Sequence, residues 1–157
     1  MIVIGILGEI GSGKSFVAKS FGYPVFNADK EVSKLYKTDR KIFKKLKKLL
    51  PQYFNKFPIN KSQVLHAILE NKTNLKKIIR VVHIEVRKRM KSFILKNKSK
   101  KLIILDIPLL LENKINKKNF ILVFVQSKKF EITKRLKKRK NYNQKLLKLF
   151  KKIQLPL

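Results

Sequence analysis

The sequence predicts an α/β fold, a parallel sheet flanked by helices, on three observations. Two apolar runs rich in β-branched residues, 2–7 and 102–106, indicate strands buried on both faces, as in parallel sheets. A glycine-rich loop leads from the first run into a helical pattern. Between the two runs, residues 29–98 show helical apolar spacing almost throughout. The 157 residues make about one domain, so we expect a single domain over 1–157 with 29–98 as a mostly helical insert.

Strands are expected where apolar, mostly β-branched residues run together between chain-breaking residues. Glycine bounds the first run, and Gly22 and Pro24 separate the first helix from the second strand. The third strand ends in an acid, Asp106, directly after buried positions. The expected strands are 2–7, 25–26, 102–106 and 120–125.

Helices are expected where apolar residues recur every three or four positions. Asp39 and Asn74 are candidate N-caps for the third and the fifth of them. Residues 51–58 predict a loop between the third and the fourth. The expected helices are 14–21, 29–36, 40–50, 64–69, 74–98, 128–138 and 144–153.

The charge is strongly positive: 40 Lys and Arg against 9 Asp and Glu give a net charge of +31. Lys outnumbers Arg by 34 to 6, whereas Arg is the residue that reads phosphates and bases bidentately. We therefore attribute the charge to codon bias and expect no specific nucleic-acid partner, although polyanions in general will be attracted. Cysteine is absent, the start lacks a basic leader segment, and Lys interrupts every apolar run. These features predict a cytoplasmic protein without disulfides or a membrane span, and we expect a monomer.

A phosphate-binding loop is the clearest motif. The pattern G-x-x-x-x-G-K-[ST] is matched at every fixed position, after a buried strand and before a helix. Backbone N–H groups of such a loop surround phosphate oxygens, its Lys bridges the β- and γ-phosphates, and its Ser ligates Mg²⁺. A glycine-rich turn without a ligand is disfavoured, because pattern and context agree. The predicted ATP-binding residues are Gly8, Glu9, Ile10, Gly11, Ser12, Gly13, Lys14, Ser15 and Phe16.

The loop alone does not specify a reaction. A GTPase would need a base-reading Asn-Lys-x-Asp segment, which residues 125–128 do not supply. The length argues against helicases and transport ATPases. A small phosphotransferase acting on a small molecule is left, with Lys14 as a catalytic residue and Ser15 as a magnesium ligand. Glu9 is expected to point to solvent, since an acid beside a triphosphate is unfavourable.

Two acids follow strands at the edge where ligands bind in open α/β sheets. Asp29, after the second strand, is a candidate to orient or deprotonate an acceptor hydroxyl, and equally a candidate N-cap of the next helix. Asp106 is a candidate magnesium ligand in a Walker B arrangement, or a turn residue before Pro108. Glu112 is a weaker candidate for the same site.

Four further side chains in the helical parts are candidates for binding anionic groups. His83 and Arg87 stand one turn apart and can together hold an anionic acceptor, although a lone His on such a face is more often a core residue. Arg135 and Arg139 have the same spacing. Two Arg in a Lys-rich chain suggest that guanidinium geometry matters, but a solvated helix face is the favoured interpretation for them.

Taken together, these segments resemble the dephospho-coenzyme A kinases, which complete coenzyme A synthesis. The order and spacing match over the whole chain, and the Asp-Ile-Pro-Leu-Leu-x-Glu segment with the Ala-Asp pair is far more specific than the loop. The matching segments are Gly8 to Ser15, Val25 to Asp29, His83 to Arg87, Leu105 to Glu112, Arg135 to Arg139, and Gln154 to Pro156.

The resemblance implies a P-loop kinase fold with a helical acceptor-binding insert and a lid over 135–153. It implies ATP and Mg²⁺ as cofactors and dephospho-coenzyme A as the substrate, phosphorylated on its ribose 3′-hydroxyl. Asp29 would be the acceptor-side acid and catalytic base, His83 and Arg87 would bind the substrate, and Arg139 would reach the nucleotide. The rival interpretations are another small P-loop nucleotide or nucleoside kinase and a non-catalytic, nucleic-acid-binding relative.

The chain departs from the family pattern at several positions. The family usually has Gly for Glu9, Asp for Asn27, Pro for Ile84 and Arg for Phe150. Its members also continue past Gln154 with another strand and a helix, so we expect this chain to be short at its C-terminal end and to leave a sheet edge exposed.

Overall fold

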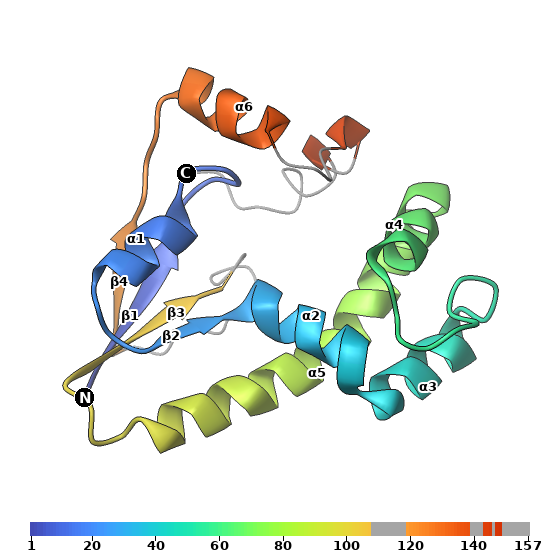
Figure 1. The fold of residues 1–157 in the computed structure, drawn as a ribbon, viewed down its shortest axis with the longest axis horizontal. Helices are drawn as coiled ribbons and strands as arrows, with labels where there is room; N and C mark the ends of the chain where they lie inside the picture. The colour runs from blue at the N-terminus through green and yellow to red at the C-terminus, as the bar shows by residue number, and fades with distance from the viewer. Residues whose placement is uncertain (108–118, 139–142, 146, 149–157) are drawn as a thin grey trace. The chain divides into compact units, whose positions relative to one another are not determined.

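The computed structural model describes residues 1–107, 119–138, 143–145 and 147–148. It divides into two compact units. Met1–Ala28 and Phe93–Leu157 form one of them, called the sheet unit below, and Asp29–Ser92 forms the helical unit. Figure 1 marks the helices and strands along the chain.

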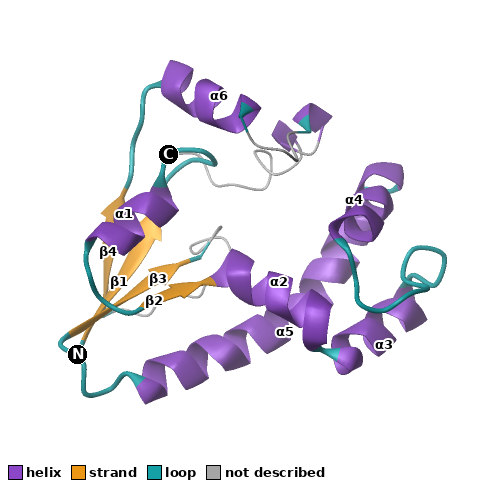
Figure 2. Ribbon diagram, viewed as in Figure 1, coloured by secondary structure: helices purple, strands orange, loops and turns teal. Residues whose placement is uncertain are grey.

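One four-stranded sheet holds all the strands of the described residues, in the order β2-β3-β1-β4 (Figure 2). The pairs β1–β3, β1–β4 and β2–β3 are all parallel, which confirms the predicted sheet. The strands are β1 (Ile2–Leu7), β2 (Val25–Asn27), β3 (Leu102–Asp106) and β4 (Phe120–Phe124), each within about one residue of its expected bounds.

The core of the sheet unit lies between the sheet and α1 (Lys14–Ser20). Ile4, Ile6, Ala18 and Ile104 form one buried cluster that joins β1, β3 and this helix. Because side chains alternate along a strand, Asp106 lies on the same face of β3 as Ile104. The α1 side of the sheet therefore carries Asp106 at the carboxyl end of β3.

The helical unit contains no strand among its residues and consists of four helices with their loops (Figure 2). Asp39 caps its helix as predicted, since its carboxylate accepts hydrogen bonds from the backbone N–H groups of Lys41 and Ile42. Leu35, Leu46 and Phe54 are fully buried. The helices are α2 (Ala28–Thr38), α3 (Arg40–Leu49), α4 (Lys61–Glu70) and α5 (Thr73–Lys96). The first residue of α2, Ala28, and the end of α5 from Phe93 onward belong to the sheet unit.

Two predicted caps are wrong. Helix α2 already begins at Ala28, so Asp29 lies inside its first turn and is not the N-cap. Asn74 lies inside α5 and donates from its buried amide to the Ala67 carbonyl, 2.9 Å away. The oxygen of the Asn71 side chain accepts instead from the Thr73 N–H at 2.9 Å. In both cases the helix starts earlier than the polar side chain suggested.

The expected exposed sheet edge is present in β4. In the described part of the chain this strand pairs only with β1, and Ile121, Leu122 and Phe124 are 51%, 41% and 45% exposed. The helix α6 (Lys129–Lys137) follows it and buries Ile132 and Leu136. None of the described helices is both long and apolar enough to cross a bilayer.

Candidate active site

The phosphate loop connects β1 to α1 and needs glycine at its first position. Gly8 has φ +137°, and a Cβ there would stand 2.2 Å from the Val125 carbonyl oxygen just beyond β4. Such a distance is a collision with backbone, so any side chain would displace the loop. The sheet itself thus fixes where the loop begins.

Helix α6 packs directly over the middle of the loop. Gly11 has φ +93°, and a Cβ there would lie 3.0 Å from Leu136 Cγ and 3.1 Å from Ile132 Cγ2. Both of these side chains are buried in the described structure. The loop conformation therefore depends on an element more than a hundred residues along the chain.

Lys14 turns back over the loop. Its Nζ donates to the carbonyl oxygens of Gly8 at 2.8 Å and Glu9 at 2.7 Å. The carbonyl of Glu9 also accepts from the Ser12 N–H. The Glu9 side chain is half-buried, so the expectation that it points to solvent stays a prediction.

Ser15 and Phe16 lie in the first turn of α1, and both are exposed, Phe16 by 79%.

Ser12 links the loop to α6 through polar contacts. Its carbonyl oxygen accepts from Ser127 Oγ at 2.8 Å and from Arg135 Nη1 at 3.2 Å. Arg135 Nη1 also lies 3.1 Å from Ser127 Oγ, which closes a three-residue network. The Arg135 side chain is 46% exposed, as expected for a solvated helix face, and in addition contacts the loop through Ser12. Arg139 and Glu112 lie outside the described residues.

Asp106 and Asn27 meet at the carboxyl end of the sheet. The two residues are register partners in the β2–β3 pair, and Asn27 Nδ2 donates to Asp106 Oδ2 at 2.5 Å. Asp106 is only 3% exposed. A buried carboxylate held by an uncharged donor keeps lone pairs for a further donor or a cation.

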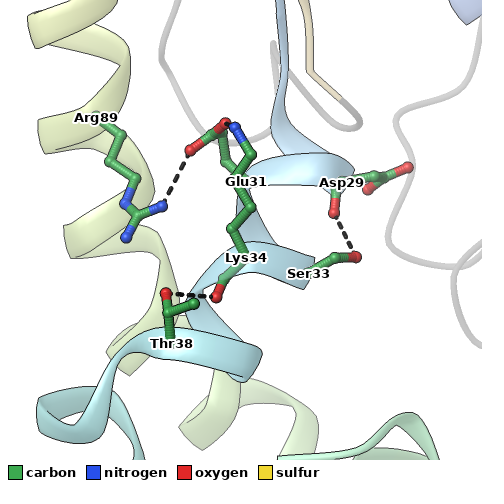
Figure 3. A network of polar contacts seen from close by, with 6 residues as sticks. All are labelled: Asp29, Glu31, Ser33, Lys34, Thr38 and Arg89. Carbon is green, nitrogen blue, oxygen red and sulfur yellow. Dashed lines mark hydrogen bonds and ion pairs between the residues drawn. The ribbon is translucent and has the colours of Figure 1, made fainter.

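Asp29 lies in the first turn of α2, in the helical unit. Its backbone carbonyl accepts from Ser33 Oγ at 2.9 Å. Figure 3 shows its carboxylate on the side of α2 that faces away from Arg89. A carboxylate in a first helical turn interacts favourably with the helix dipole.

Glu31, two residues later, ties that turn to α5. Its carboxylate accepts from Arg89 at 3.1 Å and from Lys34 at 2.7 Å (Figure 3). Partial burial would raise the pKa of Glu31, but the hydrogen bonds and charges of Lys34 and Arg89 outweigh it and lower the pKa below 4.5. The ion pair thus holds the Asp29 turn against α5.

His83 and Arg87 lie in the middle of α5, in the same unit as Asp29. His83 is half-buried beside the buried Val82, and Arg87 is exposed. The three residues predicted to handle the acceptor therefore belong to one compact unit, while Lys14, Ser15 and Asp106 belong to the other.

Sequence reasoning missed several contacts around these residues. The sequence marks Asn27 only as a departure from the family pattern, and no motif points to Ser127 or Arg89. A usable signal was present in the rarity of Arg. Three of the six, Arg40 over the Phe57 ring, Arg89 on Glu31 and Arg135 on Ser12, make contacts between separate segments.

The chain is similar to known proteins both in sequence and in structure. A family model for dephospho-CoA kinase matches residues 2–156. The dephospho-CoA kinases of Wolbachia sp. subsp. Brugia malayi and Wolbachia pipientis are 34% and 35% identical to the chain. Each alignment covers 99% of this chain and 82% of the relative. The crystal structure of TT1252 from Thermus thermophilus superposes with a TM-score of 0.75 at 29% identity, over 99% of this chain and 81% of that one.

Proposed function

The chain belongs to the dephospho-CoA kinase family, and we propose that it transfers the γ-phosphoryl group of ATP to the ribose 3′-hydroxyl of dephospho-CoA. The products are ADP and CoA, so the reaction is the last step of CoA biosynthesis. The observation that supports ATP as the phosphoryl donor is the conformation of the phosphate loop. Lys14 folds over this loop, and the close approach of the Val125 carbonyl requires glycine at position 8.

The loop supports ATP binding through its backbone. Three glycines have positive φ, at positions 8, 11 and 13, a backbone conformation that allows N–H groups of a loop to surround phosphate oxygens. The Lys14 ammonium, held on the carbonyl oxygens of Gly8 and Glu9, would supply the positive charge that the β- and γ-phosphates need. Catalysis of phosphoryl transfer is mostly positioning and neutralisation of charge, which suits such a site.

The residues present fit a magnesium ion that arrives with the nucleotide. Mg²⁺ prefers oxygen ligands and typically uses one or two protein side chains besides phosphates and water. Asp106, buried at the end of β3 on the α1 side, and Ser15, in the first turn of α1, offer a carboxylate and a hydroxyl. Bound there, the ion would neutralise charge developing on the phosphates.

The helical unit would receive the acceptor. Asp29 is proposed as the base that orients and deprotonates the 3′-hydroxyl, and His83 and Arg87 as contacts to the substrate. The Glu31–Arg89 ion pair supports this assignment, because it steadies the turn of α2 that carries Asp29. Arg139 remains a proposed nucleotide contact in the lid. The cytoplasmic location and the monomeric state predicted from the sequence stay predictions.

An acceptor panel tests the function. ADP release is followed in a coupled assay with ATP, Mg²⁺ and, in turn, dephospho-CoA, adenosine and the nucleoside monophosphates. We expect release with dephospho-CoA and none in the Lys14→Ala variant. Turnover with a nucleoside monophosphate but not with dephospho-CoA would overturn the assignment.

A further inference from the structure

We propose that Asn27 is a positioning residue: its side-chain amide orients the Asp106 carboxylate toward the magnesium ion that accompanies ATP. The inference rests on the proposed function, which gives Asp106 its role as a metal ligand. It adds a residue that no motif of the sequence singles out for binding. The inference is based on the hydrogen bond between Asn27 and Asp106, the last residues of the neighbouring strands β2 and β3.

The contact is built into the sheet. Asn27 ends β2 and Asp106 ends β3, and the parallel register pairs these two residues directly. Side chains at paired positions of neighbouring strands lie on the same face, so the amide and the carboxylate are held side by side. The 2.5 Å bond runs from Asn27 Nδ2 to Asp106 Oδ2. With Asp106 only 3% exposed, water competes little for that oxygen.

The bond is not needed to pair the strands. The backbone of β2 already pairs with β3 over three residues, and the Ile104 N–H donates to the Pro24 carbonyl at 2.9 Å just before the strand. A strand-favouring apolar residue would serve that purpose at position 27 at least as well as Asn. The presence of an amide at this place therefore points to the carboxylate it contacts.

An amide is the donor that suits a metal-binding carboxylate. It fixes one oxygen of Asp106 by a hydrogen bond and leaves the charge of the carboxylate unpaired. A Lys or Arg would bind the same oxygen but would neutralise the charge and repel Mg²⁺. An apolar side chain would leave the carboxylate free to rotate. Partners of this kind commonly change metal affinity or activity by about 10- to 100-fold.

The test measures binding rather than turnover. The full chain is titrated calorimetrically with a non-hydrolysable ATP analogue, once with Mg²⁺ and once with EDTA. The dissociation constant in EDTA divided by that in Mg²⁺ reports the metal's contribution to binding. In Asn27→Ala we expect this ratio to fall by about tenfold or more, because binding with Mg²⁺ weakens while binding in EDTA stays unchanged. Asn27→Val is the second variant, because a β-branched residue maintains strand β2 if alanine weakens it.

The matched control is Asn74→Ala. Asn74 is also a buried amide that donates one hydrogen bond, to the Ala67 carbonyl, but it lies in the helical unit. The Asn74→Ala variant should have a lower melting temperature and a wild-type ratio of the two dissociation constants. A folded Asn27 variant with a wild-type ratio overturns the inference alone. A wild-type protein that binds the analogue equally with Mg²⁺ and with EDTA overturns the metal site itself, and this inference with it.

Discussion

Replacing Asp29 by Asn removes one charge from the first turn of α2 and keeps the size and shape of the side chain. If Asp29 accepts the proton of the acceptor hydroxyl, turnover should fall by roughly 10²- to 10⁴-fold, the usual contribution of a general base. At about 1.36 kcal/mol per tenfold, this is a loss of about 2.7 to 5.4 kcal/mol of transition-state stabilisation. ATP affinity should stay at its wild-type value, because the phosphate loop is unchanged.

The structure bounds the effect of this substitution on stability. Asp29 lies inside α2, so its negative charge interacts favourably with the helix dipole, and Asp29 is not the N-cap. Losing that contribution costs about 0.3 to 1 kcal/mol. A purely structural Asp29 would therefore show a small loss of stability together with normal turnover.

Glu31→Gln is the matched control, because it removes the same charge from the same turn. Glu31 also carries the contacts to Arg89 and Lys34 (Figure 3), so its replacement should cost more stability, about 1 to 2 kcal/mol. Its turnover should remain within a few-fold of wild type. Both variants are compared by steady-state ADP release and by urea unfolding followed with circular dichroism.

The two variants should thus show opposite patterns. Asp29→Asn should lose turnover and only a little stability, and Glu31→Gln should lose more stability and keep most turnover. Near-normal turnover in Asp29→Asn would refute the proposed base. An equal loss of turnover in both variants would show that the charge of the α2 turn, and not the Asp29 carboxylate, is what the reaction needs.

Three further predictions concern the loop, α6 and the helical core. Gly8→Ala should lose measurable ATP binding in calorimetry and lower the melting temperature, because its Cβ would collide with the Val125 carbonyl at 2.2 Å; wild-type binding would contradict the close approach. Arg135→Lys keeps the charge but loses the planar contact to Ser12, so ATP affinity should fall about three- to tenfold, and unchanged affinity would make the contact dispensable. Burial raises the pKa of Tyr36 to about 12, so the folded protein keeps the phenol proton after the unfolded chain loses it near pH 10. Stability should therefore fall between about pH 10 and 12 and fall less in Tyr36→Phe, by up to about 3 kcal/mol in urea unfolding; identical slopes would contradict the burial effect.

Local sequence patterns were sufficient for the strands, for the approximate bounds of α1 to α6 and for the phosphate loop. The apolar runs that become β1 and β3 have both faces covered, so their composition alone marks them as buried strands. The loop pattern carries its own backbone requirement, which the positive φ of its two fixed glycines, Gly8 and Gly13, confirms. Asp39 acts as predicted because capping depends on its immediate neighbours only.

The polar contacts between distant segments could not be predicted in the same way. Asn27 and Asp106 meet because β2 pairs with β3, and Arg135 meets Ser12 because α6 packs over the loop. Both depend on strand order and helix placement, which no local pattern encodes. The cap assigned to Asn74 failed for a related reason. A buried bond to Ala67 gives that side chain another use, and the helix begins before it.

The most direct test of the proposed reaction is the identity of the phosphorylated product. Dephospho-CoA, ATP and Mg²⁺ are incubated with the full chain, and the products are separated and identified by mass spectrometry and phosphorus NMR. We predict CoA and ADP in equal amounts, with the new phosphate on the ribose 3′-oxygen, and neither product above background in Lys14→Ala. ADP formed without CoA, or a phosphate transferred to another position or another acceptor, would contradict the proposal.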